Sequence, residues 1–363
     1  MINIAITGYY ATGSSAMIDL LAEYDNVQVV PYGIKNYEHV PFYINGGLFN
    51  LCAILTRGNA PLVSDAAVND FVDAMKHLNN NDFRWFGGYN KKFDGGFEDI
   101  CREFVNSIGY EFSGRNVNHY VGYKANIKDV LFLLAAKFIK GRKISSWKNE
   151  IVFDEKPSFF AIPTSDEFYI AAKRFTDSYA NLFQVGEEIK YRIFDHLVLP
   201  QQIDDYSNCF SDNFKFIVLE RDPRDIYVSN KYMWGKKAKP FFPTNPDEFT
   251  EIWKRTVHSP NNSKNVLVVH FEDLIYNYNS EVKRIEDFLG LDSKRHTLPK
   301  KFFDNSVSID NTQLFRADTL WGEDMLYLEE HLSEYLYSFP YVRIAKQEDI
   351  LSYRYLKTDS TKK

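Results

Sequence analysis

The 363-residue chain has little cysteine and no long apolar run, and both scarcities narrow what it can be. Its three cysteines, Cys52, Cys101 and Cys209, are isolated in the sequence, which fits neither a disulfide framework nor the spacing of zinc ligands. We therefore expect a reducing compartment and no metal site. The most apolar stretch, 130–136, is much shorter than the roughly 20 residues of a membrane helix. The chain also opens on a short strand-like run instead of a signal peptide. These absences predict a cytoplasmic protein with no stable membrane insertion.

An excess of positive charge is also missing. The formal net charge is −6, so neither nucleic acid nor an anionic membrane surface is an expected partner. Any anionic ligand must be held by a few local groups. Aromatic residues, in contrast, are abundant, with 30 Phe and 24 Tyr. They indicate either a deep apolar core or an aromatic-lined pocket for a sugar ring or a fused-ring lipid.

Short apolar runs separated by helical patterns predict an α/β fold. Near-continuous apolar strands of this kind are typical of a central parallel sheet flanked by helices, with ligands at the carboxyl ends of the strands. The predicted strands are 2–6, 191–194, 214–219 and 266–269. The predicted core helices are 14–24, 223–233, 278–289 and 323–337. Gly290 follows the third of these helices, where a glycine commonly ends a helix.

About 180 residues separate the first two predicted strands, too many for one crossover helix. This stretch has helical patterns at 66–78, 96–108, 127–139 and 167–186. We expect a single domain over 1–363, with its core in 1–30 and 188–340. A large, mostly helical insertion over about 31–187 would pack over the ligand edge and bind the acceptor. The tail from about 357 to 363 is expected to be disordered.

The first predicted strand runs into the loop GYYATGSS, Gly8 to Ser15. Its glycine spacing is that of a phosphate-binding loop, but Ser14 stands where such a loop carries lysine. Backbone N–H groups at the start of the next helix, with the hydroxyls of Thr12, Ser14 and Ser15, can still bind an anion. A triphosphate would meet too little positive charge, so the loop suits one phosphate-like group. The alternative is a helix N-terminus that binds nothing.

The third predicted strand is followed by RDPRDIYVS, residues 221–229. Pro223 is well placed to begin a helix whose first turn holds Asp222 and Asp225. Arg221 and Ser229 can converge on one anion, because an arginine fork and a hydroxyl are suited to a phosphate. This predicts a second anion site, remote from the first.

The two motifs together resemble the sulfotransferases that use 3′-phosphoadenosine 5′-phosphosulfate, PAPS. The resemblance rests on the T-G-S-S loop, on RDPRDIYVS and on VVHFEDL before a helix that ends in FLGL; it covers the first 25 residues and roughly 190–291. It implies a P-loop-like sulfotransferase fold. It also implies that the first loop, Ala11, Thr12, Gly13, Ser14 and Ser15, binds the 5′-phosphosulfate. In this family an Arg and a Ser eight positions apart, here Arg221 and Ser229, bind the 3′-phosphate.

The same resemblance implies a catalytic histidine. The family takes its general base from a segment like K-T-H-L-P after the second strand, and this chain has FDHLVLP there, with His196 in the matching place. By itself, a His beside an Asp is more often a structural residue. Asp195 could orient the imidazole, but neighbouring residues on an extended chain point to opposite faces.

Two positions depart from the family pattern. Ala11 replaces a lysine that many members carry in the first loop, and Phe194 replaces the lysine of the K-T-H segment. The leaving phosphate must then be stabilised by loop N–H groups and the helix dipole, or by a basic residue of the insertion. Candidates for that residue are Lys35, Lys124 and Lys128. Arg316 is a further phosphate-binding candidate, although a solvated arginine is the more common reading.

The resemblance implies transfer of a sulfuryl group from PAPS to a hydroxyl, with PAPS as co-substrate and no metal. The acceptor is expected to be a saccharide of the cell-surface or capsular type, which bacterial members often modify, or a sterol-like alcohol. Trp85, Tyr89 and Trp147 in the insertion would suit stacking on either acceptor. The alternatives are a P-loop nucleotide kinase or NTPase, and a non-catalytic nucleotide-binding relative, which Ala11 and Phe194 keep open. The sequence does not predict the oligomeric state.

Overall fold

The chain divides into two compact units. The computed structural model describes residues 1–30, 39–57, 59–81, 87–112, 131, 158–234, 240, 242–316 and 322–344. The first unit, here called the sheet unit, comprises Met1–His39, Phe183–Ser207 and Asp212–Lys363. The second, here called the helical unit, comprises Val40–Leu182 and the short segment Asn208–Ser211.

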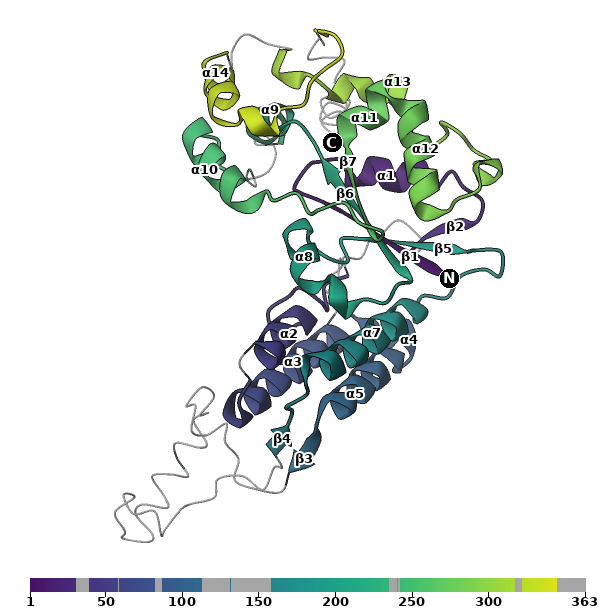
Figure 1. Cartoon of the computed structure of the whole chain (residues 1–363), viewed down its shortest axis with the longest axis vertical. Helices are drawn as coiled ribbons and strands as arrows, with labels where there is room; N and C mark the ends of the chain where they lie inside the picture. Colours follow the sequence, from purple (N-terminus) through teal and green to yellow (C-terminus); the bar gives the residue numbers. More distant parts are fainter. Residues whose placement is uncertain are drawn as a thin grey trace, which may run out of the picture. The chain divides into compact units, whose positions relative to one another are not determined.

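The sheet unit contains five parallel strands in the order β2-β5-β1-β6-β7 (Figure 1). The strands are β1 (Ile2–Gly8), β2 (Val27–Val30), β5 (Tyr191–Asp195), β6 (Phe214–Glu220) and β7 (Val266–His270). This confirms the predicted α/β fold with a parallel sheet flanked by helices. The prediction missed β2, a strand of only four residues, VQVV, in which one residue is polar.

The helices of the sheet unit follow its strands along the chain. They are α1 (Ser14–Leu21), α8 (Ile203–Tyr206), α9 (Pro223–Val228), α10 (Pro246–Thr256), α11 (Phe271–Tyr276), α12 (Tyr278–Leu289), α13 (Asn305–Ser308) and α14 (Gly322–His331). One-turn 3₁₀ segments lie at Pro200–Gln202, Ser207–Cys209, Ser293–Arg295, Ile309–Asn311, Leu314–Arg316 and Ser333–Tyr335. The helix predicted over 223–233 is in fact α9 followed by a π-helical turn, Ser229–Trp234. The one predicted over 323–337 ends earlier, at His331.

One face of the sheet is buried against α1, α11 and α12. Alternate residues of all five strands point to this face, as the two-residue period of a strand requires, and pack with the apolar sides of the three helices. The buried strand residues are Ile4, Ile6, Val27, Tyr191, Ile193, Ile217, Leu219, Leu267 and Val269. Helix α12 ends at Gly290, whose φ of 73° confirms the predicted C-terminal glycine.

The C-terminus of α1 is fixed by a buried carboxylate. Glu23 is fully buried and accepts hydrogen bonds from Nε2 of His296 and from the backbone N–H groups of Lys300, Phe302 and Phe303. A buried carboxylate is stable only with such partners. This contact holds the segment after α12 against the end of α1.

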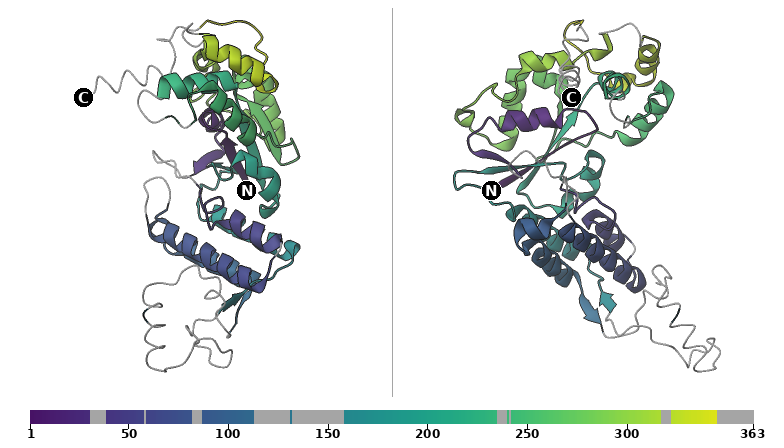
Figure 2. Two further views of the ribbon diagram at one scale, coloured as in Figure 1. Left: turned by 90° about the vertical axis from the view of Figure 1, so that its left-hand side faces the viewer. Right: turned by 180° about the vertical axis from the view of Figure 1, so that it is seen from behind.

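A separate apolar cluster joins α9, α10 and α14, which lie close together in Figures 1 and 2. Its members include Tyr227, Phe249, Trp253, Leu328 and, from the first loop, Tyr9. The Tyr9 hydroxyl bonds with the carbonyl oxygen of His258 and accepts the His258 N–H at 3.0 Å. The first residue of the loop after Gly8 is therefore anchored in the fold.

The helical unit consists of packed helices and one small hairpin. Its elements are α2 (Leu48–Thr56), α3 (Pro61–Asn80), α4 (Tyr89–Phe93), α5 (Gly96–Ile108), β3 (Tyr110–Phe112), β4 (Ser158–Phe160) and α7 (Ser165–Asn181). Strands β3 and β4 pair antiparallel. Helix α7 begins with a capping box, in which Thr164 and Glu167 each bond the other's backbone N–H. The helices predicted at 66–78, 96–108 and 167–186 correspond to α3, α5 and α7.

Aromatic rings fill the interior of the helical unit, which favours core packing as the reason for many of them. Tyr89, expected from the sequence to stack on an acceptor, is only 1% exposed, and its ring contacts Phe93, Phe97 and Tyr179. That expectation is therefore wrong for Tyr89. Trp85 and Trp147, the helix predicted at 127–139 and the tail at 357–363 lie outside the described residues. None of the helices within the described ranges combines the length and apolar character needed to span a membrane.

Candidate active site

Strand order places three loops at one edge of the sheet unit. Strand β1 lies between β5 and β6, and the three run parallel, so their carboxyl ends meet at the same edge. The chain leaves β1 towards the β2 side and leaves β6 towards β7 on the other side. A sheet in which connections diverge in this way opens a crevice between the two strands, where α/β proteins bind ligands. The strand order therefore predicts a ligand crevice between the loop after Gly8 and the segment that begins at Arg221.

Close packing shapes the loop after β1. A Cβ atom at Gly8 would lie 2.1 Å from Oγ1 of Thr12, and one at Gly13 would lie 2.7 Å from Cδ2 of Phe271. Gly13 and Ala11 both have positive φ, 97° and 62°. The glycines are therefore required by sterics as well as by backbone conformation.

The residues of this loop present different groups. Thr12 is buried and its hydroxyl donates to the carbonyl oxygen of Tyr9 at 2.7 Å, so this donor, which the sequence assigned to an anion, is used inside the loop. Gly13 is the N-cap of α1 and provides no side-chain cap. Ser14 is half-buried and Ser15 is exposed. An uncapped helix N-terminus beside two accessible hydroxyls is a favourable anion site.

Arg221 ties this loop to the far side of the crevice. Its Nη1 donates to the carbonyl oxygen of Ala11 at 3.0 Å, and its Nη2 donates to the carbonyl oxygen of Asn311. The guanidinium carbon lies 5.1 Å from the centre of the Phe271 ring, the same ring that contacts Gly13. Its Nε is buried and has no hydrogen-bond partner among the residues that the structure describes. Because a buried N–H without a partner is costly, Nε is a donor available to a ligand.

Ser229 lies at the other end of α9 from Arg221. It is buried, and its hydroxyl donates to the carbonyl oxygen of Asp225 at 2.8 Å. The structure thus brings Arg221 to the first loop, while the Ser229 side chain bonds to its own helix. To donate to a phosphate, this hydroxyl must exchange the Asp225 carbonyl for the ligand.

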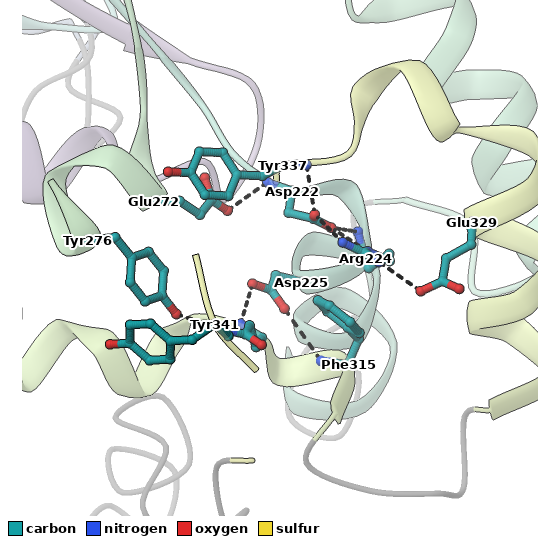
Figure 3. A network of polar contacts seen from close by, with 10 residues as sticks. Asp222, Arg224, Asp225, Glu272, Tyr276, Phe315, Glu329, Tyr337 and Tyr341 are labelled. Carbon is teal, nitrogen blue, oxygen red and sulfur yellow. Dashed lines mark hydrogen bonds and ion pairs between the residues drawn. The ribbon is translucent and has the colours of Figure 1, made fainter. Parts of the chain in front are cut away.

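Buried carboxylates fix the start of α9 (Figure 3). Asp222 caps the helix through the Arg224 N–H at 2.9 Å and pairs with the Arg224 guanidinium, which also reaches Glu329 at 2.7 Å. The predicted first turn, with Pro223 at its start and Asp222 and Asp225 nearby, is confirmed. Asp225 accepts the backbone N–H of Gln313 at 2.8 Å. Arg221 therefore follows a strand and precedes a helix that are both held rigidly.

Glu272 is the buried group that the sequence reasoning did not single out. It belongs to the FEDL segment at the start of α11, and its Oε1 accepts the Asp222 N–H at 2.9 Å. Burial, reinforced by the charge of Asp222, raises the pKa of Glu272 to about 8. Burial likewise raises the pKa of Asp225 to about 7, although the nearby Arg221 charge opposes the shift. The FEDL match in the sequence was the available signal for Glu272.

His196 follows the last residue of β5, the strand that pairs with β1. Its N–H donates to the carbonyl oxygen of Ile6 on β1 at 2.9 Å, which fixes its position relative to the central strand. Its φ is 52°, so the strand ends at Asp195 and the chain turns sharply. This turn brings Nδ1 of His196 within 2.7 Å of Oδ1 of Asp195. The argument that these side chains face apart was wrong, because it assumed extended backbone at His196.

The positions that depart from the family pattern are also explained in part. Phe194 is fully buried, with its ring against those of His39 and Phe183, so this position belongs to the core. The carbonyl oxygen of Ala11 accepts a hydrogen bond from the Arg221 guanidinium. Arg316 is exposed and lies over the Phe315 ring, as the solvated reading expects. Lys35, Lys124 and Lys128 lie outside the described residues.

Comparison with known proteins finds a match to one family model over about a third of the chain. The family model described as "Sulfotransferase domain" matches residues 192–317, which run from β5 through Arg221, Ser229 and the FEDL segment. No curated protein matches the chain. Among solved structures, the chain is similar to the sulfotransferase domain from the Synechococcus PCC 7002 olefin synthase. The two are 15% identical, with 98% of this chain and 94% of the other covered, at a TM-score of 0.33.

Proposed function

We propose that this chain, whose residues 192–317 match the family model of the sulfotransferase domain, transfers a sulfuryl group from PAPS to a hydroxyl group of a saccharide or a sterol-like alcohol. The observation that carries this proposal is the contact between Arg221 and Ala11. It joins the two motifs that the resemblance assigns to the two ends of PAPS. In support, the residues at this edge are a helix N-terminus without a side-chain cap, a partnerless arginine donor and two accessible serines.

Each end of the nucleotide then has its own partners. The N–H groups at the start of α1 and the hydroxyls of Ser14 and Ser15 bind the 5′-phosphosulfate, while Ala11, Thr12 and Gly13 set the curvature of the loop. Arg221 binds the 3′-phosphate through Nε and its remaining guanidinium protons. Ser229 joins it once its hydroxyl turns away from Asp225. Charge-assisted hydrogen bonds of this kind are the strong ones.

His196 acts as the general base in this proposal. The Asp195 carboxylate lies 2.7 Å from Nδ1 at ion-pair distance, although the present angles are not those of a hydrogen bond. In the proposal, alignment of the two groups keeps the proton on Nδ1 and leaves Nε2 as the proton acceptor. The acceptor oxygen attacks sulfur as its proton passes to Nε2, and the bond between sulfur and the bridging phosphate oxygen breaks. The products are a sulfate ester and 3′,5′-bisphosphorylated adenosine. The side chain of His196 is 33% exposed, so an acceptor can reach it.

This chain has Ala11 where the family often has a lysine that stabilises the leaving phosphate, so other groups must stabilise the negative charge of that phosphate. We assign this role to the loop N–H groups and the α1 dipole, supported by the Arg221 charge that lies against the Ala11 carbonyl. This arrangement needs no lysine at Phe194. The helical unit is proposed to hold the acceptor, with a saccharide of the cell-surface or capsular type favoured slightly over a sterol-like alcohol.

The test is transfer of labelled sulfate from PAPS to a panel of saccharides and sterols. The proposal expects a labelled product with at least one acceptor, and its loss in His196→Ala. Hydrolysis of ATP without affinity for 3′,5′-bisphosphorylated adenosine would instead indicate a P-loop kinase or NTPase. Nucleotide binding without transfer to any acceptor would indicate a non-catalytic relative.

A further inference from the structure

Two cysteines that are far apart in sequence meet in the helical unit. The thiol of Cys209 donates to the sulfur of Cys52, and the two sulfur atoms are 3.7 Å apart across 157 positions of sequence. Both side chains are buried. All three cysteines are free, as the sequence analysis expects, but the spacing of Cys52 and Cys209 in the chain does not show how close they lie in the fold.

The backbone on both sides of this contact is held in place. Cys52 lies on α2, and its carbonyl oxygen accepts the Thr56 hydroxyl at 2.7 Å. Cys209 ends a 3₁₀ turn, and its carbonyl oxygen accepts the Thr176 hydroxyl of α7 at 3.0 Å. Two residues on, the Ser211 hydroxyl bonds Oδ1 of Asp177 at 2.7 Å. Segment 208–211 is thus bound to α7, while Cys52 lies on α2.

We infer that Cys52 and Cys209 form a disulfide site, oxidised by a two-electron thiol oxidant such as a small-molecule disulfide. A disulfide bond measures about 2.0 Å between sulfur atoms. The present separation of 3.7 Å leaves less than 2 Å to close. This inference is independent of the proposed sulfuryl transfer.

The two sulfur atoms have different environments and therefore different roles in the oxidation. The hydrogen bond from Cys209, assisted by Thr56 and Tyr169, lowers the pKa of the Cys52 thiol, with Arg57 acting in the same direction. The Cys52 thiolate attacks a sulfur of the oxidant and releases one thiol. Cys209 then loses its proton and attacks the Cys52 sulfur, releasing the second thiol. Two electrons and two protons pass in total from the pair to the oxidant.

Cys101 is the internal control. It is also buried, but burial raises the pKa of its thiol, and it lies on α5. We therefore expect it to stay reduced when the pair is oxidised.

The link has a defined place in the fold. Cys209 belongs to the connection between β5 and β6, the same connection that begins with His196. Residues Asn208–Ser211 are the part of this connection that belongs to the helical unit. A Cys52–Cys209 bond would attach this segment of the connection covalently to α2. It would also close a loop that contains most of the helical unit, which restricts the unfolded chain.

Refolding in a glutathione redox buffer tests the inference, because access to buried thiols then imposes no barrier. The full-length protein is unfolded in urea and refolded at several ratios of oxidised to reduced glutathione, and peptides are mapped without reduction. We expect one crosslinked peptide pair containing Cys52 and Cys209 in wild type, with Cys101 free, and the same crosslinked pair in Cys101→Ser. The oxidised protein should resist higher urea concentrations than the reduced one. Cys52→Ser and Cys209→Ser should each abolish both the crosslink and this gain.

Two results would overturn the inference. One is a correctly refolded protein that retains three free thiols even in the most oxidising buffer. The other is a crosslink that includes Cys101 as often as Cys52. Diamide added to the folded protein gives a second measurement, since it should produce the same crosslink, at a rate set by local opening of the buried pair.

Discussion

The guanidinium of Arg221 donates a hydrogen bond to the carbonyl oxygen of Ala11 at 3.0 Å, across 210 positions of sequence. This single contact joins the loop after β1 to the end of β6, on the two sides of the crevice in the sheet. It also places a fixed positive charge at the loop position where the sulfotransferase pattern often has a lysine. The Phe271 ring packs at Gly13 of the same loop and beneath the Arg221 guanidinium.

Replacing Arg221 with alanine should weaken binding of 3′,5′-bisphosphorylated adenosine by about 10- to 100-fold, the value of one or two hydrogen bonds to a charged group. Adenosine 5′-phosphate, which lacks the 3′-phosphate, should lose much less. Calorimetric titration with both nucleotides measures the difference, and Arg316→Ala is the matched control because Arg316 is exposed. Equal losses for both nucleotides would limit Arg221 to anchoring the loop.

His196→Ala should lower kcat of sulfuryl transfer by about 10²- to 10⁴-fold, the usual contribution of a general base. Its effect on nucleotide affinity should be small, because the imidazole contacts the acceptor. Asp195→Asn should give a smaller loss, since the amide holds the ring without favouring the correct tautomer. Steady-state kinetics and nucleotide titration of the same preparations separate the two effects. Transfer at the wild-type rate in His196→Ala would refute its role as base.

Gly13→Ala should destabilise the loop in two ways. The positive φ of 97° opposes any side chain, and the new Cβ would clash with Phe271. Gly95→Ala is the matched control, because Gly95 also has a positive φ, 83°, but no atom lies within 4 Å of the added Cβ. We expect about 1 kcal/mol of lost stability for Gly95→Ala, from backbone strain alone. Gly13→Ala should lose more in urea unfolding and should also bind nucleotide more weakly. Equal losses of stability in Gly13→Ala and Gly95→Ala would mean that the Phe271 ring moves away from the new Cβ with no loss of free energy.

The buried carboxyl of Glu272 should make the stability of the fold depend on pH. Its folded-state pKa, about 8, lies above the ordinary value of 4.5, so the native state binds the extra proton between these values. The free energy of unfolding should therefore fall as pH rises through this window. Asp225, raised to about 7, adds to the same trend, while the charges of Arg221 and Asp222 that face Glu272 oppose each other.

Glu272→Gln isolates this contribution. Its amide oxygen can still accept the Asp222 N–H, and the group does not ionise. Urea unfolding at about pH 5.5 and about pH 8 should show a smaller loss of stability for the variant than for wild type. Identical pH dependence of the two proteins would show that Glu272 stays ionised throughout.

Local patterns in the sequence were enough to predict the framework of the sheet unit. The runs at Ile2, Tyr191, Phe214 and Val266 are apolar enough to mark buried strands, and parallel strands place the loops that follow them at one edge. The same reasoning placed Arg221 at the edge that carries the first loop, and His196 at the end of the strand that pairs with β1. Strand β2 was not predicted because its four residues are too few to show a detectable two-residue alternation.

Contacts between distant segments were beyond the sequence. The bond from Arg221 to Ala11 depends on the strand order, and the 3.7 Å approach of Cys52 to Cys209 depends on helix packing. The pairing of Asp195 with His196 depends on one positive φ angle, which a non-glycine residue adopts only when its surroundings fix it. Thr12 was misjudged because its hydroxyl serves the loop itself.

The most direct test of the account is a calorimetric titration of the wild-type protein with 3′,5′-bisphosphorylated adenosine and, separately, with ATP and Mg²⁺. The account predicts one site for the bisphosphate, with an affinity at least about tenfold higher than that for ATP. The reason is that the loop lacks a lysine to bind the outer phosphates of ATP, whereas Arg221 can bind the 3′-phosphate that only the bisphosphate carries. Tighter binding of ATP with Mg²⁺ than of the bisphosphate would contradict it.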